Sequence, residues 1–191
     1  MKKIPTLFDR VFNNRRIVGI TDTITPGCED AFENGIATIK IDGSCCAVIN
    51  GEFYKRYDAK KGKKPPVGAI PCCEPDPVTG HWPHWVKLDQ SNPSDKWFWK
   101  AKDWNEARQT EPLEDGTYEA YGKHFNGNPY DLEDDRLIPH GILSVEVERD
   151  FESVRDWLNN HKHEGLVFWL NGEPVCKIKR TDFGYSWPVK E

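Results

Sequence analysis

The sequence lacks any apolar segment long enough to cross a membrane. No stretch approaches the roughly 20 consecutive apolar residues of a membrane-spanning helix. The N-terminal sequence MKKIPTLFDR has no apolar core of the length that a signal peptide needs. The chain also has no low-complexity run and no internal repeat of the solenoid type. We therefore expect a cytoplasmic protein that does not engage a membrane.

The cysteines do not follow the spacing of a disulfide framework. Four of the six form adjacent pairs, Cys45-Cys46 and Cys72-Cys73, whereas structural zinc sites usually separate two cysteines by two to four residues. His81 and His84 follow the second pair. A zinc site there remains a weaker alternative to ordinary loop residues packed among tryptophans.

Positive charge is not in excess. The formal net charge is −5, so the chain as a whole is not a polycation that coats nucleic acid. Basic residues nevertheless gather at 55–64 and at 177–180. The lysine-rich stretch KKGKKPP (60–66) is either a solvated loop or a loop that steers a polynucleotide backbone, and the sequence leaves both open.

Apolar residues are numerous enough for a sizeable core. They make up 37% of the 191 residues, with eight tryptophans and nine phenylalanines, beside 30% charged residues. This composition excludes a disordered chain and fits one large domain. We expect an α+β fold built on antiparallel sheet, with a single domain over 1–191.

Two Asn-Gly pairs predict β-hairpins. Asn50-Gly51 lies within AVINGEFYKRY and Asn171-Gly172 within LVFWLNGEPVCKIKR, each between two runs rich in strand-forming residues. Asparagine and glycine accept the positive φ angles of a tight type I′ turn. Further strands are predicted over 117–125 and 141–147.

A helix is predicted over DFESVRDWLNNHKH, between the last two strand regions. Asp150 can cap its N-terminus. Four apolar residues share one face of this helix: Phe151, Val154, Trp157 and Leu158. Residues 58–112, rich in proline, lysine and tryptophan, show no clear period and predict loops with short helical turns.

Lys40 stands at an unusual place, in the stretch IKIDGS of a predicted core strand. A lysine head group there is costly unless it reaches solvent or is used. A lone lysine is most often at the solvent edge of a strand. Further polar features follow it in order: Asp42-Gly43, Arg56, Glu119, Gly122, Glu164-Gly165, Lys177 and Lys179.

This order resembles the covalent nucleotidyltransferase superfamily of polynucleotide ligases and mRNA-capping guanylyltransferases. The matching motifs are KIDG (40–43) for the nucleophile, then KRY (55–57), YEAYG (118–122), EGLVF (164–168) and KIKR (177–180). These motifs span nearly the whole chain. The sequence EGLVF…KIKR-TDFG is most similar to that of RNA ligases, especially minimal ones. The resemblance implies an α+β, antiparallel-sheet nucleotidyltransferase (ATP-grasp-like ligase adenylylation) domain.

The chemistry of Lys40 agrees with that resemblance. A lysine amine is a nucleophile only when it is neutral, so its pKa has to fall from the ordinary value of about 10.4. Burial and neighbouring cations both act in this direction. Lys177 and Lys179 are two apart on a predicted strand and project from one face. They would contact a triphosphate there, or else form an exposed cationic strand edge.

Two glutamates are expected at the site. Glu164 supplies the hard carboxylate that Mg²⁺ prefers, with Gly165 leaving room for the nucleotide. The alternative for Glu164 is a surface residue after the helix. Glu119, facing opposite to Tyr118 and Ala120, would accept hydrogen bonds from ribose hydroxyls or from a metal-bound water.

Other roles follow from the motifs and the resemblance. Arg56 would bind a phosphate or a sugar, and Asp42 would orient the nucleophile loop or merely form a turn. Val167 would pack against the purine, whose other face has no assigned partner. The expected catalytic residues are Lys40, Asp42, Glu164, Lys177 and Lys179. The expected nucleotide contacts are Ile39, Lys40, Arg56, Glu119, Val167, Lys177 and Lys179, and the expected metal ligand is Glu164.

The sequence thus predicts an ATP-dependent RNA ligase that uses Mg²⁺ or Mn²⁺. Lys40 would form a lysyl-AMP, the AMP would pass to an RNA 5′-phosphate, and a 3′-hydroxyl would displace it. A capping-type guanylyltransferase acting on GTP and a non-catalytic polynucleotide-binding domain are the alternatives. Only eleven residues follow Arg180, so we expect no appended OB-type domain.

Overall fold

The computed structural model describes residues 2–14, 16–108 and 112–189. It divides the chain into two compact units. Unit 1 comprises Met1–Lys3 and Asp42–His140, and unit 2 comprises Ile4–Ile41 and Gly141–Glu191. Within the described ranges, no helix is long and apolar enough to cross a membrane.

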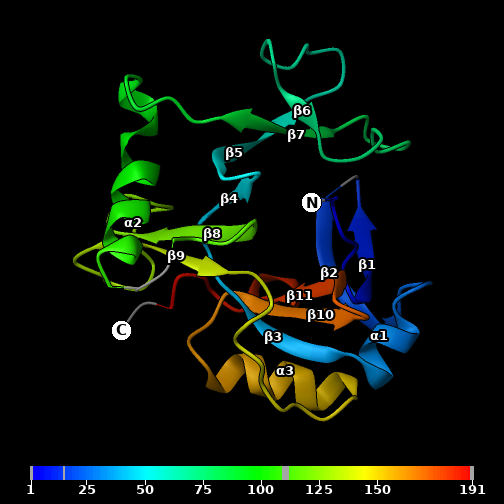
Figure 1. Cartoon of the computed structure of the whole chain (residues 1–191). Coiled ribbons are helices and arrows are strands. Elements are labelled where there is room, and N and C mark those ends of the chain that lie inside the picture. Colours follow the sequence, from blue (N-terminus) through cyan, green and yellow to red (C-terminus); the bar gives the residue numbers. More distant parts are fainter. Residues whose placement is uncertain (1, 15, 109–111, 190–191) are drawn as a thin grey trace. The chain divides into compact units, whose positions relative to one another are not determined.

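Unit 2 is built on two small antiparallel sheets (Figure 1). Its elements are β1 (Phe8–Asn13), β2 (Arg16–Ile24), α1 (Glu29–Asn34), β3 (Ile36–Lys40), α3 (Phe151–Asn160), β10 (Gly165–Leu170), β11 (Glu173–Lys179) and the 3-10 helix η2 (Arg180–Phe183). One sheet pairs β1 with β2, and the other has the order β11-β10-β3. A core including Phe8, Phe32, Leu158 and Phe168 holds the strands and helices together.

Among its described residues, unit 1 contains one antiparallel sheet with the order β6-β7-β5-β4-β8-β9. Its elements are β4 (Ser44–Ile49), β5 (Glu52–Ala59), β6 (Ile70–Pro71), β7 (Trp82–Lys87), the 3-10 helix η1 (Pro93–Asp95), α2 (Lys96–Glu106), β8 (Gly116–Gly122) and β9 (Asp135–Pro139). The α+β class with antiparallel sheet is confirmed in both units. The prediction of one domain over 1–191 stays a prediction.

Both predicted hairpins are confirmed. Asn50 and Gly51 have φ angles of 52° and 74° between β4 and β5. Asn171 and Gly172 have φ angles of 51° and 78° between β10 and β11. Positive φ at both central residues is the geometry of a type I′ turn, which these residue types adopt at little cost.

The predicted strand over 141–147 is wrong. Gly141 has a φ of 81°, and the side chains of Ile142 and Leu143 are 55% and 36% exposed. The segment makes only a bridge at Ser144 and isolated backbone bonds to β3, such as that from the Ile39 amide to the Leu143 carbonyl at 2.9 Å. The apolar residues predicted a strand, but the turn at Gly141 prevents a regular ladder.

The prediction of loops for residues 58–112 is also partly wrong. This region contains β7, which pairs with β5 over six residue positions, and the eleven-residue helix α2. Trp97, Phe98 and Trp99 of α2 pack against the core of unit 1. Because tryptophans occupy several faces of the helix, no simple apolar period marked it in the sequence.

Helix α3 forms as predicted, and its two ends are held differently. At the N-terminus, the Asp150 carboxylate accepts a hydrogen bond of 2.8 Å from the Ser153 amide. At the C-terminus, the buried guanidinium of Arg180 donates to the Leu158 carbonyl and, at 2.9 Å, to the His161 carbonyl. Arg180 therefore binds the carbonyls that a helix end leaves without partners.

Replacing Arg180 with methionine is expected to lower the free energy of unfolding by about 3 kcal/mol, since buried carbonyls would lose a charged donor. Urea unfolding measures the loss. Arg155→Met on the same helix is the control, because Arg155 is 36% exposed and its ion pairs lie at the surface. Equal losses in the two variants would contradict the capping role.

Candidate functional site

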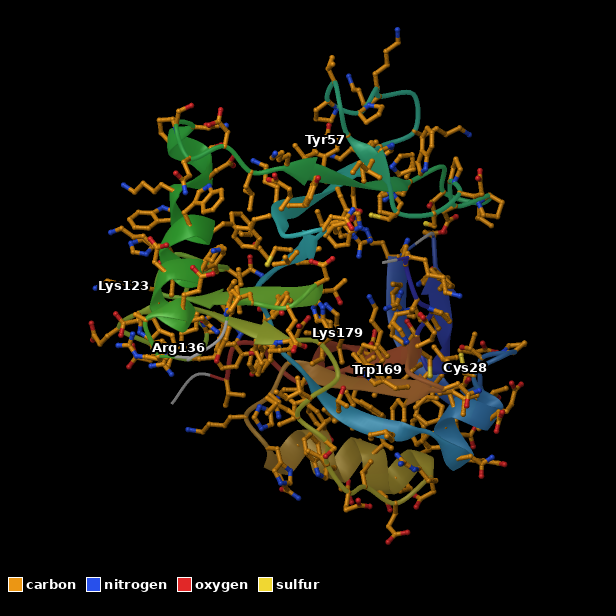
Figure 2. All side chains as sticks on the ribbon, in the orientation of Figure 1. Cys28, Tyr57, Lys123, Arg136, Trp169 and Lys179 are labelled. Carbon is orange, nitrogen blue, oxygen red and sulfur yellow. The ribbon has the colours of Figure 1, made fainter. Side chains whose placement is uncertain are left out.

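Three lysines share one face of the three-stranded sheet in unit 2. Gly165 on β10 lies opposite Lys40 on β3 and opposite Lys179 on β11. Two positions along, Val167 lies opposite Lys177. Residues that are directly opposite, or two apart on one strand, project from the same side of a sheet. The register therefore brings the three lysines and Val167 together, and Figure 2 labels Lys179 on β11.

Ile39 lies on the other face. It pairs with Leu166, which in turn pairs with Ile178, and both of these side chains are fully buried in the core of unit 2. The structure thus brings together four of the expected nucleotide contacts on one sheet face, but not Ile39. Its side chain is directed to the opposite side.

Glu164 joins two of the lysines. Its Oε2 atom lies 2.5 Å from Nζ of Lys40, and its Oε1 atom bonds Nζ of Lys179. The glutamate is buried, at 4% exposure, whereas 21% of the Lys40 side chain and 32% of the Lys179 side chain are accessible. A surface position for Glu164 is therefore wrong. The carboxylate compensates part of the positive charge on this face.

Gly165 has a packing reason to be glycine. A Cβ atom there would lie 2.1 Å from the carbonyl oxygen of Ile178. The backbone of β10 can approach β11 at this point only without a side chain. This close approach brings Glu164 and Lys179 within bonding distance, and it gives the Glu-Gly pair a reason in strand packing.

The pKa of Lys177 is perturbed by its surroundings. Burial, followed by the positive charges of Lys40 and Lys179, lowers the pKa of its amine from 10.5 to about 8, and Glu164 only partly opposes this. The pKa of this lysine therefore lies near neutrality. A lysine that served only in packing would gain no stability from two neighbouring lysines, so this arrangement is typical of a functional site.

Replacing Lys177 with methionine is expected to stabilise the protein at pH 7 by about 1–3 kcal/mol. Because the folded state binds the Lys177 proton less tightly than the unfolded state, wild-type stability falls as the pH drops toward the folded pKa of about 8. The methionine variant has no amine at this position, so it does not lose stability in this way. Its advantage in urea unfolding should shrink between pH 8 and pH 10.5, and an advantage independent of pH would contradict the assignment.

Arg10 and Asp182 extend the charged cluster, and sequence reasoning missed both. Nη2 of Arg10 lies 3.0 Å from Oδ1 of Asp182, whose Oδ2 accepts a 2.9 Å hydrogen bond from the Lys179 amide. Arg10 also lowers the pKa of Lys177. No local signal connects Arg10 with a residue 172 positions away. The TDFG sequence after KIKR was the available indication for Asp182.

The Asp42-Gly43 turn belongs to unit 1. The Asn126 side-chain amide donates to Oδ1 of Asp42 and to the carbonyl of Gly43, both at 2.7 Å, and the Asp42 amide donates to the Tyr130 hydroxyl. A Cβ atom on Gly43 would lie 2.2 Å from the carbonyl oxygen of Ala120 on β8. The turn is therefore fixed closely against the sheet of unit 1.

Arg56 and Glu119 also lie in the sheet of unit 1. Nε of Arg56 lies 2.9 Å from Oδ1 of Asp58 on the same strand. Glu119 faces away from the buried side chains of Tyr118 and Ala120, as predicted. Its Oε2 atom lies 2.8 Å from Nε2 of His140. Both side chains are thus already held by polar partners.

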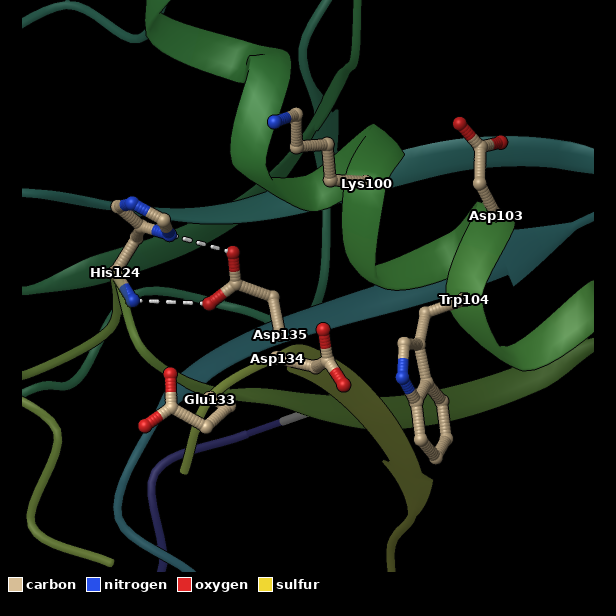
Figure 3. Close-up of a pocket in the computed structure, with 7 residues that line it drawn as sticks. All are labelled: Lys100, Asp103, Trp104, His124, Glu133, Asp134 and Asp135. Carbon is tan, nitrogen blue, oxygen red and sulfur yellow. Dashed lines mark hydrogen bonds and ion pairs between the residues drawn. The ribbon is translucent and has the colours of Figure 1, made fainter. Parts of the chain in front are cut away.

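A separate hollow in unit 1 contains none of the predicted site residues (Figure 3). It is lined by Lys100, Asp103, Trp104, His124, Glu133, Asp134 and Asp135. Asp135 accepts hydrogen bonds from the backbone amide of His124 at 2.9 Å and bonds its ring at 2.7 Å. Its acidic lining does not suit a phosphate.

The unit 2 cluster, in contrast, suits a polyanion. Three lysine side chains face one side of the sheet, and the buried carboxylate of Glu164 bonds two of them. The lysines fit phosphate oxygens. Glu164 offers one hard oxygen donor, which fits Mg²⁺ or Mn²⁺, because such ions bind through few carboxylates together with substrate phosphates.

The comparisons with known proteins agree with one another, because each finds proteins named RNA ligase 1. A family model described as RNA ligase 1 matches residues 106–191. RNA ligase 1 of Danio rerio is 28% identical over 224 residues, covering 81% of this chain and 69% of the relative. RNA ligase 1 of Pongo abelii and of Rattus norvegicus are 24% and 25% identical over 241 residues, covering 90% of this chain and 74% of each relative. The chain is thus similar over most of its length to proteins named RNA ligase 1, and its C-terminal part matches the model of that family.

Proposed function

We propose that this chain is an ATP-dependent RNA ligase that joins 5′-phosphate and 3′-hydroxyl ends through a lysyl-AMP intermediate. One observation carries the proposal: Lys40, Lys177 and Lys179 share a sheet face, with Glu164 bonded to Lys40 and Lys179. The similarity to proteins named RNA ligase 1 supports RNA as the polynucleotide.

Lys40 is the proposed nucleophile. Its amine attacks the α-phosphorus of ATP, a P–N bond forms, and pyrophosphate leaves. The RNA 5′-phosphate then displaces Lys40 from AMP, and a 3′-hydroxyl of a second end displaces AMP to form the phosphodiester. Each of these steps transfers a nucleotidyl or a polynucleotide group from one nucleophile to another, and no atom is oxidised or reduced.

Glu164 has two proposed tasks. First, its carboxylate bonds the Lys40 amine at 2.5 Å and so fixes the position of this side chain. Second, its carboxylate would hold a divalent cation together with the substrate phosphates. When bound, such a cation (Mg²⁺ or Mn²⁺) would neutralise negative charge on the phosphates. Lys177 and Lys179 would bind the phosphate oxygens as charge develops on the leaving pyrophosphate.

The remaining assignments concern the nucleotide. We propose that Val167, on the same sheet face as the lysines, packs against the purine. Arg56 and Glu119 would bind a phosphate and the ribose, and Asp42 would hold the loop after Lys40. Ile39 would act through its backbone, since its side chain lies on the core face. Residues 1–191 would then act as one nucleotidyltransferase domain.

A ligation assay tests the proposal. Purified protein is incubated with 5′-labelled RNA that has a 3′-hydroxyl, with ATP or GTP and with Mg²⁺ or Mn²⁺, and the products are separated on a denaturing gel. Joined or circularised RNA should form with ATP and should require the 5′-phosphate. Lys87→Met, which alters a 58% exposed lysine in unit 1, is the control and should remain active. Activity with GTP alone, or none in folded protein, would contradict the proposal.

A further inference from the structure

Three different kinds of metal ligand converge in unit 1. The sulfur of Cys45, a carboxylate oxygen of Glu119 and a ring nitrogen of His140 all lie within 4.8 Å of one another. Cys45 on β4 pairs directly with Glu119 on β8, and His140 follows β9, which pairs with β8 on its other side. Three strand segments distant in sequence therefore deliver the three side chains to one point.

The imidazole of His140 is held at both nitrogens. Nδ1 lies 3.0 Å from the Thr117 hydroxyl, and Nε2 lies 2.8 Å from Oε2 of Glu119. The donor and acceptor roles of the two nitrogens depend on the tautomer, and in the tautomer in which Nδ1 donates to Thr117 the lone pair of Nε2 faces Glu119 and is available to a cation. A histidine that binds a metal typically has its other nitrogen anchored in this way.

We propose that Cys45, Glu119 and His140 form a binding site for one Zn²⁺ ion. A thiolate, an imidazole and a carboxylate are the ligand types of zinc, whereas Mg²⁺ prefers oxygen alone. Three protein ligands leave a fourth position for water or for a ligand. Glu119 and His140 are 12% and 19% accessible, which gives an ion a path from solvent.

The surrounding charges are compatible with a cation. Burial, followed by the Glu119 carboxylate, raises the pKa of the Cys45 thiol to about 12. Arg56 is the nearby positive charge that opposes this shift. The Arg56 guanidinium is paired with Asp58 at 2.9 Å, which offsets its repulsion of a cation.

The zinc proposal does not depend on the proposed ligase activity. Cys45, Glu119 and His140 all belong to unit 1, whereas Lys40, Glu164, Lys177 and Lys179 belong to unit 2. Glu119 is the single residue that the two proposals share. Zinc bound there would occupy the carboxylate proposed to contact the ribose, so an effect on ligation would follow from competition for Glu119.

Cobalt titration tests the site directly, because a cobalt–thiolate bond produces a charge-transfer absorption. Metal-free wild-type protein should gain this absorption up to one equivalent of Co²⁺ and lose it on addition of Zn²⁺. Cys45→Ser should abolish the absorption, and His140→Gln should weaken cobalt binding by about tenfold or more. Cys73→Ser and His81→Gln, which alter the same residue types elsewhere in unit 1, are the controls and should bind as wild type.

Thermal unfolding gives a second readout. Zn²⁺ should raise the unfolding temperature of the wild type and of both controls, but not that of Cys45→Ser or His140→Gln, since a ligand stabilises only the state that binds it. The inference is overturned when folded wild type shows no cobalt–thiolate absorption. It is also overturned when Cys45→Ser retains the absorption, or when Cys73→Ser removes it. None of these results depends on whether the protein joins RNA.

Discussion

Replacing Lys40 with methionine is expected to abolish ATP-dependent joining of RNA ends, with a loss of at least about a thousandfold. Methionine retains an unbranched side chain of similar length but provides no amine to accept AMP, and a covalent step without its nucleophile has no equivalent route. The ligation assay with 5′-phosphate RNA measures the loss. Lys87→Met, in which the replaced lysine is 58% exposed, should stay within about twofold of wild type.

The same Lys40→Met protein should still join RNA that carries a preformed 5′-adenylyl group. In that substrate the AMP has already been transferred, so the remaining displacement by the 3′-hydroxyl does not use the lysine amine. Glu164 also bonds Lys179, and because this bond does not involve Lys40, the site should stay folded in the variant. Full ATP-dependent ligation by Lys40→Met would contradict the proposed covalent step. Loss of both reactions in folded protein would assign Lys40 to substrate binding instead.

Glu164→Gln is expected to eliminate ligation with ATP and to lower the free energy of unfolding by about 3 kcal/mol. Glu164 is 4% exposed and bonds Lys40 and Lys179. Removal of one partner from a buried ion pair leaves the opposite charge uncompensated, which typically costs several kcal/mol. Glutamine can accept a hydrogen bond but cannot neutralise either ammonium group. Urea unfolding and the ligation assay measure the two effects.

An anion should partly restore the stability of Glu164→Gln. With the carboxylate removed, three lysines remain on one sheet face, and pyrophosphate should raise the unfolding temperature of this variant more than that of wild type. Glu173→Gln, an exposed position at the start of β11, should change neither stability nor activity. Equal responses of the Glu164 and Glu173 variants to pyrophosphate would contradict the charge-compensating role of Glu164.

The fold could be predicted where short-range chemistry determines it. Asn50-Gly51 and Asn171-Gly172 specify their turns within two residues, and Asp150 begins α3 through one local hydrogen bond. The burial of α2 depends on contacts with distant strands, which a pattern in one segment does not reveal. The error at 141–147 has the same origin: apolar residues predicted a strand that Gly141 does not allow.

The candidate site could be predicted in part, for a similar reason. Lys40, Glu164, Lys177 and Lys179 were found because their order and local strand patterns are visible along the chain, and the register brings them together. Arg10 was missed because only β1 in the folded chain carries it to Asp182. The grouping of Cys45 with Glu119 and His140 was missed too, since it arises from three segments with no common motif.

Mass spectrometry of the protein after incubation with ATP and a divalent cation tests the central claim most directly. The account predicts a mass increase of one AMP per chain, located on the peptide that contains Lys40, stable to alkali and removed by acid. Addition of a 5′-phosphate RNA should discharge it. AMP attached to a different residue, or no AMP on folded protein that joins RNA with ATP, would contradict the account.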